Sequence, residues 1–297
     1  MRRSLISVSL AGLMLLIWPA TAFAATDPGL GTAGNYAVLA AATITNTGPS
    51  WITGKLALHP GTSVIGFPPG TVGAQDKTNG AALQARNDAK AAYTNAAGQT
   101  PFVTLSADLG GQTLVPGIYR YSSSAGLTGT LTLNGGGVYI FQIGSALTTA
   151  SSSRVVLING AQPCDIFWQI GSSATIGGAT AFVGTILANT SITMVTAATL
   201  NGRALAGVGA SPGSDSGALT LDTNRIIQPS GCPGGFTASY PTPAYVPPPA
   251  GNILPATLGV PFDLGAGTTW LLVLAVGAGL GATALVVSNR RRRRRTA

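Results

Sequence analysis

Between Asn35 and Ile227 the sequence consists of short β-prone runs that end at Gly, Asn or Pro. Runs such as "GVYIFQIG", "DIFWQIG" and "FVGTILA" are rich in β-branched and aromatic residues. Similar phrases return at intervals of roughly 20 residues, each with small polar residues, then Thr, then a short apolar strand. One coil of this kind cannot bury its apolar side alone, whereas a stack of coils can. The pattern therefore favours a stacked β-solenoid over a sandwich or a barrel.

One segment, at about residues 76–97, departs from this pattern and predicts a helix. Ala recurs there at spacings of three and four, which places methyl groups along one helical face. The residues of this face are Ala81, Ala85, Ala89, Ala92 and Ala96. A face made only of methyl groups lets a helix lie close to a sheet, so we expect the helix to cover one side of the strands. The charged residues expected in solvent are Lys77, Arg86, Asp88 and Lys90.

Charge is concentrated at the two ends of the chain. The formal net charge is +8, but half of the basic residues are Arg2, Arg3 and the run at 290–295. Between residues 27 and 230, eight Lys or Arg residues stand against seven Asp residues, so this part is nearly neutral. A nucleic-acid-binding domain carries a basic stripe. The charge pattern therefore argues against nucleic acid as a partner.

Residues 1–24 are typical of a secretory signal peptide. Arg2 and Arg3 precede an apolar run over residues 4–18, and the small residues Ala22 and Ala24 mark a cleavage site. We therefore expect an exported mature chain that begins at Ala25, followed by a folded body over residues 25–228.

The C-terminal part predicts a stalk and an anchor. Residues 229–267 are rich in Pro and Gly, which is typical of a semi-extended linker. Residues 268–288 are long and apolar enough for a transmembrane helix, and the Arg-rich tail 289–297 would stay in the cytoplasm. The stretch "LPATL" at 254–258 resembles a sortase sorting signal, with Leu in place of the final Gly, and cleavage would follow Thr257. We expect attachment at the cell surface through this helix or, with a sortase, to the cell wall.

The chain has two cysteines, Cys164 and Cys232. A disulfide between them is the expected state in an exported protein, and it would hold the start of the stalk against the body. The lone His59 is far from both in sequence, so we expect no metal site and no cofactor. The sequence contains no nucleophile elbow and no phosphate loop, and we expect no enzyme activity.

A tetrad of Thr, Ala or Gly, any residue, and Thr or Ser recurs in the body. It occurs at 47–50, 149–152 and 196–199, with a looser form at 177–180. If the tetrads fall at the same point of successive coils, their side chains form columns about 4.7–4.9 Å apart. Such an uncharged lattice of hydroxyl and methyl groups would hold ordered, ice-like water, although Thr is also simply favoured on exposed strands. The candidate surface residues are Thr47, Ser50, Thr149, Ser152, Thr180, Thr196 and Thr199.

Several long phrases resemble the microbial ice-binding protein family, also called DUF3494. They include "YAVLAAATITNTGPSWITGKLALHPGTSVIGFPPGTV", "TPFVTLSADLGGQTLVPGIYRYSSSAGLTGTLTLNGGGVYIFQIG" and "FVGTILANTSITMVTAATLNGRALA", and the resemblance covers about residues 30–228. It implies a mainly β fold, a discontinuous right-handed β-solenoid of triangular section with one long α-helix along its side. It also implies no catalysis and a partner that is the surface of an ice crystal. The family's Thr-Ala/Gly-x-Thr/Asn motif matches best at 196–199.

The resemblance predicts adsorption to ice through a flat Thr- and Ser-rich face, which would inhibit recrystallisation or attach the cell to ice. The alternative is a surface adhesin or stiff spacer that binds glycan or protein. Exposed aromatic side chains would favour that alternative, and Trp51 and Trp168 are the residues to inspect, although Trp168 is expected in the core. A polar cleft around His59 would favour an enzyme.

Overall fold

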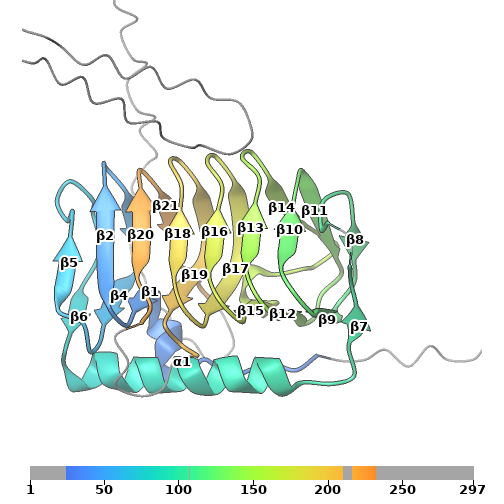
Figure 1. Cartoon of the computed structure of the whole chain (residues 1–297), viewed down its shortest axis with the longest axis horizontal. Helices are drawn as coiled ribbons and strands as arrows, with labels where there is room; N and C mark the ends of the chain where they lie inside the picture. Colours follow the sequence, from blue (N-terminus) through green and yellow to red (C-terminus); the bar gives the residue numbers. More distant parts are fainter. Residues whose placement is uncertain (1–24, 107, 210–215, 232–297) are drawn as a thin grey trace, which may run out of the picture. The chain divides into compact units, whose positions relative to one another are not determined.

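The computed structural model describes residues 25–106, 108–209 and 216–231, which belong to one compact unit. This part is mainly β, with one α-helix and two 3₁₀ turns, η1 (Gly31–Asn35) and η2 (Pro163–Asp165). The strand pairs of its two sheets are parallel, and Figure 1 shows successive passes of the chain stacked as coils.

The smaller sheet has seven strands, most of three or four residues. Their order across the sheet is β10 (Ala125–Leu127), β13 (Leu147–Thr149), β16 (Ala174–Ile176), β18 (Ile192–Met194), β20 (Leu219–Asp222), β2 (Thr43–Thr47) and β5 (Ser63–Ile65). In β2, β13, β16 and β18 the burial alternates: the residues on either side of a central threonine are turned to the core and the threonine is turned to solvent.

The larger sheet contains two series of strands that share the eight-residue strands β17 (Ala181–Ala188) and β19 (Thr199–Ala206). The helix-facing series runs β6 (Gln75–Lys77), β4 (Lys55–Leu58), β1 (Tyr36–Ala40), β19, β17, β15 (Ile166–Ile170), β12 (Tyr139–Ile143), β9 (Gly117–Tyr121) and β7 (Val103–Thr104). The second series, which we call the third face, runs β3 (Trp51–Thr53), β21 (Arg225–Ile227), β19, β17, β14 (Arg154–Ile158), β11 (Thr130–Asn134) and β8 (Thr113–Leu114).

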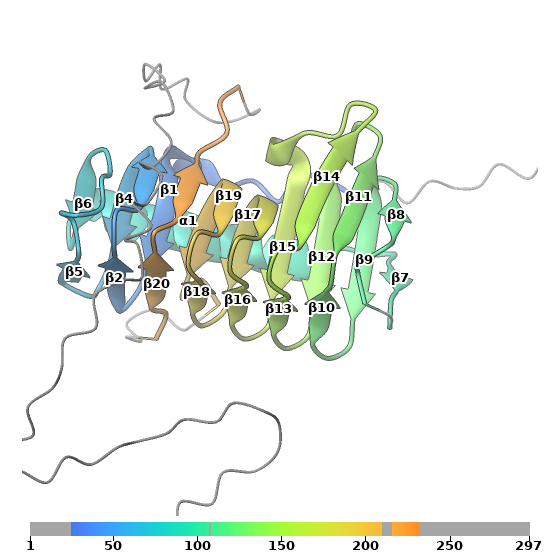
Figure 2. The ribbon, with the colours of Figure 1, turned by 90° about the horizontal axis from the view of Figure 1, so that it is seen from above.

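The order of coils along the stack differs from their order in the sequence. The first coils, with β1 to β6, lie at one end of the stack, the helix then runs to the other end, and the later coils return toward the first (Figures 1 and 2). As a result β20 pairs with β2, β21 with β3 and β19 with β1. These three pairings join the last described coil to the first and hold the stack together.

Helix α1 (Gly80–Gly98) lies along the helix-facing series. It begins at Gly80 rather than near residue 76, because Gln75–Lys77 pairs with β4 and the side chain of Asn79 accepts a hydrogen bond of 2.9 Å from the Ala82 amide. Its buried methyl face contains Ala82 in place of the expected Ala81, which is exposed. Arg86 is 5% exposed, so the prediction that it lies in solvent is wrong.

Aromatic rings form a column through the core between the three faces. Tyr119 stacks on Phe141 with centroids 5.5 Å apart, Phe141 on Trp168 at 4.0 Å, and Trp168 lies against Phe182 at 4.8 Å. The Trp168 indole also donates a hydrogen bond of 2.9 Å to the Val183 carbonyl. Trp168 is therefore a core residue, as expected, and ties neighbouring coils together.

Several expectations fall outside the described residues: the signal peptide at 1–24, Cys232, most of the stalk, the sorting-signal residue Thr257, the apolar segment 268–288 and the tail 289–297. Within the described part, no helix combines the length and the apolar character needed to cross a membrane.

We predict that the protein loses stability above about pH 10. Burial raises the pKa of each described tyrosine, and that of Tyr139 rises to about 12. Unfolded tyrosines ionise near pH 10, so the stabilisation from the buried neutral side chains is complete below that pH. For Tyr139 this stabilisation is lost as the pH rises to about 12, and the loss is on the order of 2 kcal/mol. Buried Arg203 acts in the opposite direction, because burial lowers its pKa to about 10, but it is one group against five.

Urea unfolding at pH 8, 10 and 11.5 measures this loss. Tyr139→Phe should flatten the decline, since Phe cannot ionise. An unfolding free energy that does not fall over this range would contradict the prediction.

Candidate functional site

The outward side of the seven-stranded sheet, which we call the ladder face, carries a column of threonines. Five of them occupy the same position on adjacent strands, each in register with the next: Thr45, Thr220, Thr193, Thr175 and Thr148. The residues before and after each are buried, with Ile192 and Met194 on either side of Thr193 as an example. We call this column the Thr ladder. Ile65 continues it at one end and Gly126 at the other.

The backbone fixes the spacing of the Thr ladder. Parallel strands lie about 4.7–4.9 Å apart, and outward residues of one strand recur at about 6.6 Å. Thr43, two residues before Thr45, pairs with Ser63 and begins a second outward column of small side chains. Threonine is stiff at χ1, so its hydroxyl and methyl groups hold fixed directions. The result is a regular array of alternating polar and apolar groups.

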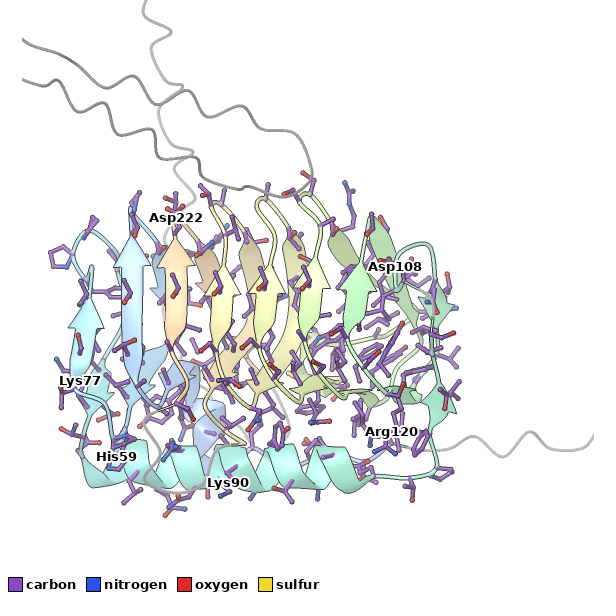
Figure 3. The ribbon with its side chains drawn as sticks, in the orientation of Figure 1. His59, Lys77, Lys90, Asp108, Arg120 and Asp222 are labelled. Atoms are coloured by element: carbon purple, nitrogen blue, oxygen red, sulfur yellow. The ribbon has the colours of Figure 1, made fainter. Side chains whose placement is uncertain are left out.

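Charged groups lie mostly away from this face. Among the outward residues of its seven strands, the one ionisable side chain is Asp222, at the end of β20. Figure 3 shows Asp222 at the upper edge of the face, whereas Lys77, His59, Lys90 and Arg120 lie on the side of the helix. The Asp108 carboxylate borders the face at its Gly126 end. A Cβ added at Gly126 would lie 2.8 Å from a carboxylate oxygen of Asp108.

The four tetrads identified in the sequence lie together at one edge of the ladder face, where the chain turns into the third face. They enter this corner in different phases. Counted from the ladder threonine of the same strand, a tetrad begins one residue later at Thr149, two later at Thr47 and Gly177, and three later at Thr196. Because strand side chains alternate, Thr149, one residue after its ladder threonine, is buried, whereas Thr47, two residues after, is exposed. Thr196 lies beyond the end of β18, in the turn, and is exposed as well.

The corner repeats one backbone conformation from coil to coil. Its left-handed residues are Gly48, Ser152, Ala179, Ala197 and Thr223, with φ between 53° and 77°. A small buried side chain follows each of them within two residues: Ser50, Ser153, Thr180, Ala198 and Asn224. Short polar side chains at such turns hydrogen-bond the backbone locally. The tetrads therefore encode a turn.

The buried side chains of the tetrads form hydrogen bonds that stabilise the turn. The Thr180 hydroxyl donates to the Ala150 carbonyl at 3.0 Å and lies 3.2 Å from the Thr149 hydroxyl, which accepts from the Gly177 amide at 2.8 Å. The Ser50 hydroxyl accepts from the Asn224 amide at 2.8 Å. Ser50, Thr149 and Thr180, with at most 3% of their surface exposed, do not contribute to an outer face.

The other predicted residues are accessible but lie at or beyond this corner. Thr47 and Thr196 border the ladder face, and Ser152 lies in the turn itself. Thr199 is the first residue of β19, in the third-face series, and is partly exposed.

The sequence contains a signal for the Thr ladder that the tetrad pattern obscures. Each ladder threonine is the centre of a triplet whose flanking residues face the core: "ITN", "LTL", "ITM", "ATI" and "LTT". A threonine between two inward side chains of a short strand is outward by alternation alone. From Thr148 on, the triplets return after 27, 18 and 27 residues, and the triplet at Thr45 lies 103 residues before Thr148, which hides them from a search for one fixed period.

We predict that Thr180→Val destabilises the domain by about 1–3 kcal/mol, because it removes two buried interactions of the Thr180 hydroxyl, its hydrogen bond to the Ala150 carbonyl and its contact with the Thr149 hydroxyl. Chemical unfolding measures the change. Ser152→Ala, in the exposed part of the same corner, is the matched control and should change stability by less than about 0.5 kcal/mol. An equal effect of the two substitutions would show that the buried hydroxyl is not important for the turn.

The other candidate residues are placed as follows. Trp51, on β3, is half-buried, and the Arg225 guanidinium covers its ring at 4.7 Å. Neither it nor Trp168 offers the open aromatic surface that would favour a glycan-binding module. In the described part no three His, Cys or Asp side chains are grouped to hold a metal. Cys164, in η2, is disulfide-bonded, and the pairing with Cys232 stays a prediction.

Comparison with known proteins agrees with this fold and composition. The model of the ice-binding-like family matches residues 38–227, which is most of the described part. The chain belongs to the ice-binding-like family. An ice-binding protein of Nostoc sp. (strain HG1) is 49% identical over 204 residues, covering 66% of this chain and 72% of the relative.

Solved structures of this family have the same fold. An ice-binding protein from an Antarctic biological consortium gives a TM-score of 0.66 at 41% identity, covering 71% of this chain and 95% of that one. One from the Antarctic ascomycete Antarctomyces psychrotrophicus gives 0.64 at 36% identity, covering 69% and 100%. These related chains consist almost wholly of the matching region, which supports the study of residues 25–242 as a separate domain. The family is one of ice-binding proteins and not of enzymes.

Proposed function

We propose that this protein adsorbs to ice through the ladder face. The observation that carries the proposal is the in-register Thr ladder, five coils long, on a sheet whose outward strand positions contain one ionisable side chain. Family membership and the names of the relatives agree with this function. Thr47 and Thr196 lie at the edge of this proposed contact surface, at the corner.

The physical basis is a match between a rigid array and ordered water. Each hydroxyl can hydrogen-bond to a surface water, and each methyl favours a cage of water around it. One threonine contributes little, since a methyl group is worth about 0.8 kcal/mol even when fully removed from liquid water. Adsorption therefore depends on the number of groups held in register, and the stiff stacked backbone supplies that register.

The fold and the location form part of the same proposal. The stacked coils fit a right-handed, triangular β-solenoid. The N-terminal 24 residues and the apolar segment at 268–288 support export and attachment at the cell surface, directly or after cleavage by a sortase at Thr257. An anchored domain of this kind would limit recrystallisation near the cell or hold the cell on ice.

Retention by growing ice tests the function. Residues 25–242, fluorescently labelled, are placed around a slowly growing ice hemisphere, and the protein found in the ice is compared with that left in the liquid. We expect enrichment on the ice surface, whereas labelled serum albumin is excluded. Exclusion of the domain at the same rate as albumin would overturn the proposed function.

A further inference from the structure

Asp222 occupies the same surface as the Thr ladder. It follows Thr220 by two residues on β20, so both side chains are outward, about 6.6 Å apart along the strand. Its position is in register with Thr47 on β2. A negative formal charge therefore lies on β20, one outward position beyond Thr220 of the Thr ladder.

The contacts of Asp222 place its charge at the corner turn. One carboxylate oxygen accepts a hydrogen bond from the Thr196 hydroxyl, and the other accepts from the Thr223 hydroxyl at 3.2 Å. Both donors are exposed hydroxyl groups at the edge of the face. The carboxylate therefore orients the two hydroxyls toward itself and directs the surrounding water around an anion.

We propose that Asp222 limits the affinity of the ladder face for ice and sets its boundary at this corner. The inference rests on the proposed function. Liquid water reorients around a carboxylate, whereas a crystalline water layer cannot do so, and removing water from an unpaired charge is costly. Asp222 therefore opposes the extension of ordered water from the Thr ladder to Thr47 and Thr196.

Asn and Thr are the informative replacements. The Asn carbonyl can accept from one of the two hydroxyls, while its amide donates to the other, so Asp222→Asn removes the charge and keeps the corner contacts. Asp222→Thr places a β-branched residue and a hydroxyl beside the Thr ladder, in register with Thr47. Asp222→Glu keeps the charge at the same position.

The experiment measures the lowest concentration of residues 25–242 that stops ice recrystallisation, together with the melting temperature. We expect Asp222→Asn or Asp222→Thr to need roughly two- to five-fold less protein, equivalent to about 0.4–1 kcal/mol. Asp222→Glu should not improve on the wild type. Asp165→Asn, in η2 before the helix-facing strand β15, removes one negative charge elsewhere and should leave the concentration that stops recrystallisation unchanged.

Failure of the inference on Asp222 is distinguishable from failure of the proposed function. If the wild type stops recrystallisation and neither neutral variant exceeds it, the inference on Asp222 is wrong while the proposed function stands. The same conclusion follows if Asp165→Asn improves activity as much as Asp222→Asn, since net charge would then be the cause. If the wild type has no effect on ice, the proposed function itself fails.

Discussion

Replacing Thr193 by Tyr is expected to reduce adsorption to ice by at least about tenfold, equivalent to 1.4 kcal/mol. Thr193 lies at the centre of the Thr ladder, with Thr175 and Thr220 in register on either side. A phenol there stands above the plane and holds a flat crystal surface away from the neighbouring threonines. The backbone is unaffected because the side chain points to solvent, so the melting temperature should stay within a few degrees of the wild type.

Asn201→Tyr is the matched control, since Asn201 is an exposed residue in the part of β19 that pairs with β21 in the third-face series. It should leave retention by ice unchanged. Thr196→Tyr, at the edge of the ladder face, should have an intermediate effect. If Asn201→Tyr weakened adsorption more than Thr193→Tyr, the contact surface would be the third face.

Trp168→Ala is expected to cost about 3–5 kcal/mol of unfolding free energy. Trp168 is fully buried, stacks on Phe141 and hydrogen-bonds to the next coil through Val183. The substitution leaves a cavity inside the aromatic column, and a stack of short strands can collapse into it only partly. Chemical denaturation gives the free energy directly, and the loss is large compared with the 5–15 kcal/mol typical of a whole domain.

Trp51→Ala provides the comparison with a tryptophan outside the core. Trp51 is half-buried and its described ring contact is with Arg225, so the lost cation–π interaction is worth about 0.5–1 kcal/mol, with some lost packing in addition. A loss of stability for Trp168→Ala no larger than that for Trp51→Ala would show that the aromatic column does not hold the coils together.

The sequence predicts the stacked coils and the helix because both follow from local periodicity. Alternation of apolar residues in strands such as Tyr139–Ile143, and the spacing of Ala85, Ala89, Ala92 and Ala96, are direct consequences of backbone geometry. The start of the helix and the buried position of Arg86 depend on tertiary contacts. The β6–β4 pairing displaces the helix start, and no local pattern reveals that pairing.

The candidate surface was predicted less well, because the tetrads begin at different distances from the ladder threonines and so do not point to the same side of each coil. The tetrads do recur at one corner of the coils, but the buried hydroxyls of Ser50, Thr149 and Thr180 support the turn. Threonine is common both at such turns and on exposed strands, so composition alone does not separate the two. The register between strands separates them, and it becomes visible only when residues as distant as Thr45 and Thr220 are paired.

The most direct test of the ladder face is a measurement of which threonines touch ice. Residues 25–242, with ¹³C-labelled threonine methyl groups, are frozen, and magnetisation is transferred from ice protons to carbon by solid-state NMR. We expect strong transfer to Thr148, Thr175, Thr193 and Thr220, and little to Thr53, Thr130 and Thr132 of the third face. Transfer that is equal for the two groups, or stronger for the third face, would contradict this expectation.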